Sequence, residues 1–195
     1  MTLLLSMAAF ALATSISPGP VNLVALSAGA RFGLRASLWH VTGATLGFTL
    51  LLVAMGLGVQ QLLQQWPVLA TLIQGAGVAF LFYMAYRLAR DDGRLQADER
   101  QKPPSLLTGA LMQWLNPKAW LASLAGMGAY AAEGEVGEVL RFAALYFVIC
   151  YLSLACWAYA GAFLGRYLES PRRMRRFNRG LALLLVLSAL YLLWA

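Results

Sequence analysis

Two short proline-containing motifs each interrupt a long apolar segment, one in each half of the chain. The first is Ser17-Pro18-Gly19-Pro20-Val21-Asn22 and the second is Leu115-Asn116-Pro117-Lys118-Ala119. A proline inside a helix removes a backbone donor and clashes with the carbonyl group four residues earlier. Hydrocarbon tolerates such a break only where the freed polar groups face protein or a water-filled cavity. A matched pair of breaks therefore indicates a substrate site inside the membrane.

The two breaks predict binding of a zwitterion. The carbonyl groups of Thr14, Ile16 and Gln113 lose their helical donors, so we expect them to accept from a cation or an ammonium group. The helices that restart after each break present unpaired N–H groups and a positive dipole end, which suit a carboxylate. An amino acid carries both charges a few ångströms apart. The predicted substrate-binding residues are Pro18, Gly19, Pro20, Asn22, Asn116, Pro117 and Lys118.

Three polar side chains have alternative interpretations. Asn22 and Asn116 can each donate to and accept from a ligand, or they can cap the broken backbone instead. Lys118 is the charged residue nearest the centre of a segment, where an ammonium group costs several kcal/mol unless it is paired or hydrated. Its partner is a substrate carboxylate, water or free carbonyls, unless it snorkels to an interface. His40 and Lys118 are the candidates for gating or proton transfer, although His40 also suits an interface position.

The composition is that of an integral membrane protein. Of the 195 residues 61% are hydrophobic and 12% are charged, and the mean hydropathy is +0.67. The apolar runs predict an all-α protein with six transmembrane helices, the first and fourth of which are broken by proline. Three segments in each half require oppositely oriented halves, which is a 3+3 inverted repeat in a single domain, 1–195. The expected spans are about 3–30, 37–60, 67–89, 105–131, 139–165 and 177–195.

The distribution of basic residues predicts the orientation. Apart from Lys118 and Arg141, every Lys and Arg falls in the first, third or fifth connector. The positive-inside rule then places these connectors in the cytoplasm and both termini outside it. The half-repeats, about 1–90 and 104–195, are joined by the polar cytoplasmic connector 91–103. The net charge of +7 follows from this topology. We therefore expect the basic residues to contact the lipid bilayer and not nucleic acid.

Other function classes find less support in the sequence. Cys150 and Cys156 lie in one apolar run and are expected to be buried fillers, not a disulfide or metal site. One histidine and no acid deep in a span argue against a metal centre, a cofactor and a membrane enzyme. A channel and a membrane-embedded redox conduit stay as alternatives. The glycine pairs 29/33, 43/47 and 161/165 suit a tight bundle and a homodimer equally well.

The chain resembles the LysE/RhtB family of amino-acid exporters over nearly its whole length. The resemblance rests on Ser17-Pro18-Gly19-Pro20, Gly33, Gly43-xxx-Gly47, the polar connector after Tyr86-Arg87, and Leu115-Asn116-Pro117-Lys118-Ala119. It implies a secondary transporter that exports amino acids or their derivatives across the bacterial inner membrane with the proton gradient.

The chain departs from the family pattern at two positions and is similar to one subgroup. Members often carry Asp where Phe48 stands here, so any role of that acid in proton coupling or substrate binding does not carry over. Asn22 lies one position beyond the asparagine that often follows the proline motif in the family. Gly47-Phe48, and Cys156-Trp157 followed by Gly161, are similar to the subgroup that exports cysteine and O-acetylserine.

Overall fold

A computed structural model describes residues 2–59, 65–90, 102–168 and 170–194, and these residues form helices and no strand. Most of the predicted cytoplasmic connector, residues 91–101, lies outside the described residues. The elements in chain order are α1 (Thr2–Ile16), α2 (Pro20–Ala54), the π-helix η1 (Met55–Val59), α4 (Pro67–Ala89), α5 (Leu106–Trp114), α6 (Pro117–Tyr130), α7 (Val136–Gly165) and α8 (Pro171–Trp194). The chain is thus an all-helical protein, as the apolar runs predict.

Three helices are long and apolar enough by themselves to cross a membrane, within the part of the chain that the structure describes. They cover Pro20–Val59, Thr71–Ala89 and Val136–Gly165. The first has 40 residues, and an unbroken helix of that length would measure about 60 Å, roughly twice the hydrocarbon thickness of a bilayer. Helix α1 is apolar but shorter, and α5 and α6 have 9 and 14 residues.

Gly33 divides α2 into two segments. Its φ of 78° and ψ of 170° are not helical, whereas the residues on both sides continue the helix. We expected a connector over about 31–36, and the structure replaces it with this single-residue break. Glycine allows the change of direction because it has no Cβ to clash at positive φ. The 40-residue segment therefore supplies two arms, 20–32 and 34–59.

Each proline motif lies between two helices. Helix α1 ends at Ile16, and α2 begins at Pro20 after an extended Gly19 (φ −163°, ψ 172°). Helix α5 ends at Trp114, and α6 begins at Pro117 after Asn116. Proline suits the first position of a helix because the N–H group that it lacks would have no partner there. The prolines thus begin new helices instead of bending continuous ones.

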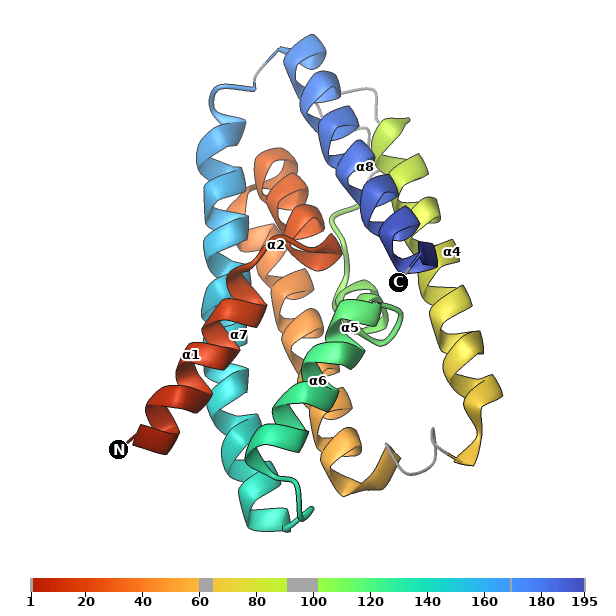
Figure 1. The fold of residues 1–195 in the computed structure, drawn as a ribbon. Helices are drawn as coiled ribbons and strands as arrows, with labels where there is room; N and C mark the ends of the chain where they lie inside the picture. Colours follow the sequence, from red (N-terminus) through yellow and green to blue (C-terminus); the bar gives the residue numbers. More distant parts are fainter. Residues whose placement is uncertain (1, 60–64, 91–101, 169, 195) are drawn as a thin grey trace.

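Helices α2 and α7 form the centre of the bundle. Helix α2 packs against α7 and α5, while α1 packs against α7. Figure 1 shows α1 beside α7 along one edge, and α4 beside α8 along the other. One hydrophobic core includes Met7, Leu51 and Phe142, and a second, between α4 and α8, includes Leu81 and Leu185. This arrangement brings the α1–α2 and α5–α6 breaks toward each other inside the bundle.

Small residues let the central helices approach closely. A Cβ added to Gly29 would overlap the carbonyl oxygen of Ala158, and one on Gly161 would overlap that of Leu26. On the other side of α2, a Cβ on Gly43 would overlap the carbonyl of Leu106. Each of these glycines therefore packs against backbone of its own chain, as small residues do in membrane bundles. A homodimer stays a prediction, and its interface would have to use residues other than these glycines.

Candidate functional site

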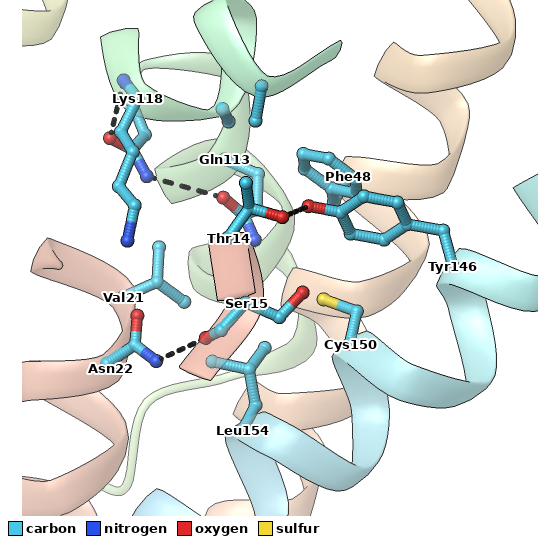
Figure 2. Close-up of a pocket in the computed structure, with 13 residues that line it drawn as sticks. Thr14, Ser15, Val21, Asn22, Phe48, Gln113, Lys118, Tyr146, Cys150 and Leu154 are labelled. Carbon is cyan, nitrogen blue, oxygen red and sulfur yellow. Dashed lines mark hydrogen bonds between the residues drawn. The ribbon is translucent and has the colours of Figure 1, made fainter. Parts of the chain in front are cut away.

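A small cavity lies where the two breaks meet. Its volume is about 30 Å³, which is room for on the order of two water molecules. Figure 2 shows side chains converging on it from the end of α1, the start of α2, the α5–α6 break and the middle of α7. The residues that line it are Thr14, Ser15, Val21, Asn22, Phe48, Gln113, Asn116, Lys118, Ala119, Ala122, Tyr146, Cys150 and Leu154.

Lys118 connects the two breaks. It stands in the first turn of α6, and its half-buried side chain extends to the other break. There Nζ donates to the carbonyl oxygen and the hydroxyl oxygen of Ser17, both at 2.8 Å, and to the carbonyl oxygen of Pro18 at 3.4 Å. These acceptors follow the C-terminal end of α1, where the helix dipole is negative. Of the partners that we weighed for this ammonium group, backbone carbonyls are the ones present.

Both asparagines bind backbone within their own break. Asn22 is buried, and its Nδ2 donates to the carbonyl oxygen of Ser15 at 2.9 Å. Asn116 caps α6, because its Oδ1 accepts from the Lys118 backbone N–H at 3.2 Å. Its Nδ2 also lies 3.4 Å from Oε1 of Gln113. The capping interpretation thus describes this conformation, while both amides still line the cavity.

The carbonyls that we expected to accept from a substrate already have donors from the protein. The Thr14 oxygen accepts from the Ser17 hydroxyl at 3.1 Å, and the Ile16 oxygen accepts from Trp157 Nε1 at 3.0 Å. The Gln113 oxygen accepts from the backbone N–H of Asn116 at 3.1 Å. A carbonyl oxygen has two lone pairs, so one donor each leaves acceptance from a substrate as a prediction. Buried backbone groups rarely stay unpaired, so nearby donors satisfy the broken helix ends.

One face of α7 lines the cavity, which the sequence analysis did not anticipate. Tyr146, Cys150 and Leu154 follow one another at intervals of four residues, so they share a helix face. The Tyr146 hydroxyl is hydrogen-bonded to Thr14 Oγ1 at 2.5 Å, and its ring stacks on Phe48 with centroids 4.5 Å apart. A tyrosine and a cysteine one turn apart in an apolar helix were the signal that could have revealed this face.

The described lining of the cavity has one charged side chain, Lys118. The acidic residues for which the structure gives positions, Glu133, Glu135 and Glu138, all lie near the turn between α6 and α7. Helices α2 and α6 also direct their positive N-terminal ends into this region. The C-terminal ends of α1 and α5 bring negative dipole ends to the same region, so the net positive charge of the described lining comes from Lys118.

The remaining sequence candidates lie elsewhere. Pro18, Gly19, Pro20 and Pro117 shape the backbone beside the cavity but do not line it. Gly19 packs against Lys118, since an added Cβ would lie 3.3 Å from its Nζ. His40 is also outside the cavity lining.

His40 and Cys156 differ from their expected positions, whereas Cys150 does not. His40 is fully buried rather than at an interface, and neither ring nitrogen has a hydrogen-bond partner within the described residues. Cys150 is buried, as expected of a filler, but Cys156 is exposed. Residues 2–59, 65–90, 102–168 and 170–194 contain no group of three side chains that could hold a metal ion.

Comparison with known proteins identifies the class. The family model described as LysE type translocator matches residues 12–195. The chain therefore belongs to the LysE type translocator family and is a membrane transporter, not an enzyme.

Several curated relatives carry the same name. The chain is 30% identical over 195 residues to the "Cysteine/O-acetylserine efflux protein" of Escherichia coli (strain K12), covering 96% of each chain. It is 28% identical over 187 residues to the protein of that name from Salmonella choleraesuis (strain SC-B67), covering 93% of this chain and 91% of the relative. No solved structure matches the chain significantly.

Proposed function

We propose that this protein exports small amino acids or their derivatives from the cytoplasm across the bacterial inner membrane. Cysteine and O-acetylserine are the first substrates to test, because the relatives that match over nearly their whole length are efflux proteins named for them. Both molecules are small zwitterions near neutral pH. They differ only in the side chain, so one recognition site for the charged backbone serves both.

The substrate carboxylate binds at Lys118 in this proposal. The observation that carries it is the ammonium group of Lys118, held across the two breaks at a cavity whose described lining contains no carboxylate. A cation held by uncharged oxygens can gain a charged partner without breaking an ion pair. The Ser15 hydroxyl, buried with no hydrogen-bond partner among the described residues, and the Tyr146 hydroxyl are acceptors for the substrate ammonium group.

Binding requires the site to open. A volume of about 30 Å³ holds water and not an amino acid, so this conformation has no room for the substrate at the site. Ala119 and Ala122 on α6 line the same cavity as Tyr146 and Cys150 on α7. In our proposal, a movement of α6 away from α7 makes room there for a small side chain.

We propose a transporter domain of six spans arranged as a 3+3 inverted repeat, with half-repeats of about 1–90 and 104–195. Support comes from equivalent packing: α1 lies on α7, α5 lies on α2, and α4 lies on α8. Further support is that α2 and α6 each begin at the proline of a break. Alternating access then results from one half rocking against the other around the site.

The proposed orientation places both termini outside the cytoplasm. The basic residues of the first, third and fifth connectors support it. A reporter enzyme that is active only outside the cytoplasm, fused at the C-terminus, should give high activity. The same reporter inserted near residue 96 should give none, and the reverse pattern would overturn the orientation.

The proton gradient is the proposed energy source, with His40 and Lys118 as the candidate proton carriers. His40 supports this role because two ring nitrogens without partners are costly in a buried position unless a proton or water visits them. It lies on α2, the helix that also carries Asn22 and Phe48 of the cavity. Phe48 itself has no ionisable group to replace the acid found in relatives.

Uptake into everted membrane vesicles tests the proposed function. Their outer face is the cytoplasmic face, so export is measured as accumulation. We expect saturable accumulation of labelled cysteine or O-acetylserine that increases when the vesicle interior is acidified. Flux that never saturates would favour a channel, and no accumulation of any amino acid in a panel would overturn the proposal.

A further inference from the structure

A second and much larger cavity lies next to the substrate site. It has a volume of about 520 Å³, against about 30 Å³ for the site at the breaks. It lies between α2, α4 and the segment that leads into α5. Its described lining includes the cations Arg31, Arg87 and Lys102, each from a different element, and no Asp or Glu.

The two cavities follow the same pair of helices. On α2, Val21 lines the small cavity and Val24 lines the large one, one helical turn further along. On α5, Gln113 borders the small cavity, while Leu111 and Thr108 border the large one. Val21 and Val24 are both buried. The large cavity is therefore positioned where a molecule can bind before it reaches the substrate site.

We propose that this cavity is the cytoplasmic entry vestibule and a first, low-affinity binding site for the carboxylate of the exported amino acid. This inference rests on the proposed function. Arg31 in α2 and Arg87 in the last turn of α4 belong to the sequence regions that the charge distribution assigns to the cytoplasmic side. A cleft with cations from three elements and low-dielectric walls concentrates anionic groups.

The vestibule also contains polar and aromatic groups at which a small zwitterion can pause. Ser27 and Thr108 present hydroxyls from α2 and α5, and Tyr83 on α4 adds an aromatic ring. The Arg31 guanidinium lies 5.5 Å from the Phe32 ring centroid, which keeps that cation beside the cavity. From there the carboxylate passes along α2 toward Lys118, so it meets a cation at each end of the path.

The decisive experiment compares two double variants in proteoliposomes of the purified protein, prepared with zwitterionic lipid alone or with added anionic lipid, with labelled L-cysteine as the probe. Arg87→Gln with Lys102→Gln removes two vestibule cations. Arg35→Gln with Arg90→Gln removes two exposed cations of the same side that do not line the cavity. The two variants have the same net charge, so a difference between them cannot come from overall electrostatics.

We expect the vestibule variant to raise KM for cysteine by about three- to tenfold with little change in the maximal rate, because each exposed charge pair contributes modestly. The control variant should retain the wild-type KM. High salt should raise the wild-type KM toward that of the vestibule variant. Inhibition by cysteinamide, which lacks the carboxylate, should be equal in all three proteins.

The outcomes separate this inference from the proposed function. If the wild-type protein accumulates cysteine and both double variants have its KM, the vestibule proposal is wrong and the exporter proposal stands. A KM that rises only when anionic lipid is present would assign the cations to lipid headgroups and also overturn the vestibule. If the wild-type protein transports no amino acid, both proposals fail together.

Discussion

The ammonium nitrogen of Lys118 lies 2.8 Å from the carbonyl oxygen of Ser17, a residue 101 positions earlier in the chain. One side chain thereby joins the two places where helices are interrupted. It also occupies the first turn of α6, where the helix dipole disfavours a cation. In the proposed function, the same ammonium group binds the substrate carboxylate.

The contact between Thr14 and Tyr146 should stabilise the closed site. Tyr146→Phe keeps the ring stacked on Phe48 but removes the hydroxyl that bonds to Thr14. We expect a loss of about 1 kcal/mol of stability, measured as a lower unfolding temperature in detergent. Leu152→Ala, at an exposed position of the same helix, is the control and should have a smaller effect. Equal effects would show that the hydrogen bond contributes nothing.

The contact of α2 with α7 depends on Gly29. Gly29→Ala would push a methyl group into the Ala158 carbonyl, and backbone cannot yield as a flexible side chain does. We expect a cost of about 1–3 kcal/mol and a reduced level of folded protein in the membrane.

Gly75→Ala is the matched control for this substitution, because an added Cβ there meets nothing within 4 Å. Alanine favours the helix over glycine by about 1 kcal/mol, so this variant should be neutral or slightly more stable. Thermal unfolding of the two purified proteins in one detergent compares them. A stable Gly29→Ala protein would contradict the packing of α2 on α7.

The break at Gly33 should tolerate few residues. Gly33→Ala meets no neighbour within 4 Å, so its cost is the conformational strain of a Cβ at φ 78°. We expect a loss of about 1–2 kcal/mol, and a smaller loss for Gly33→Asn, since asparagine accepts positive φ more readily than alanine. The order of the three unfolding temperatures checks this. Alanine at least as stable as glycine would show that α2 can straighten.

His40 should affect energy coupling more than substrate binding. His40→Asn retains a polar side chain but cannot carry a proton. We expect accumulation driven by a pH gradient to fall at least tenfold, while exchange of labelled for unlabelled cysteine without a gradient continues. Parallel uptake and exchange assays in the same vesicles separate the two. Loss of both activities would assign His40 a structural role, and normal accumulation would remove it from the proton path.

The general character of the fold follows from simple sequence features. Long apolar runs predict membrane helices, and proline at the first position of a helix explains why α2 begins at Pro20 and α6 at Pro117. The sequence predicted an interruption over about 31–36, but not that the structure would confine it to Gly33. A glycine among helix-forming residues adopts positive φ where tertiary packing requires it, so the exact residue depends on the assembled bundle.

The candidate site was only partly predictable. Asn22, Asn116 and Lys118 stand out because polar groups are rare in apolar segments, and all three line the cavity. Tyr146 comes from a helix without a break, so its place in the cavity depends on how α7 packs. The donor that Trp157 supplies to Ile16 also joins distant segments. Contacts of that kind depend on the assembled bundle and leave no local pattern.

The most direct test of the account is saturable uptake of labelled L-cysteine by everted vesicles that contain equal amounts of wild-type, Lys118→Met or Arg35→Met protein. Methionine keeps much of the length of lysine without its charge, and Arg35 is an exposed cation away from the cavity. We predict saturable uptake by the wild-type and Arg35→Met proteins and a loss of at least tenfold in kcat/KM for Lys118→Met. Wild-type kinetics in the Lys118→Met protein would contradict the claim that the two breaks form the substrate site around this ammonium group.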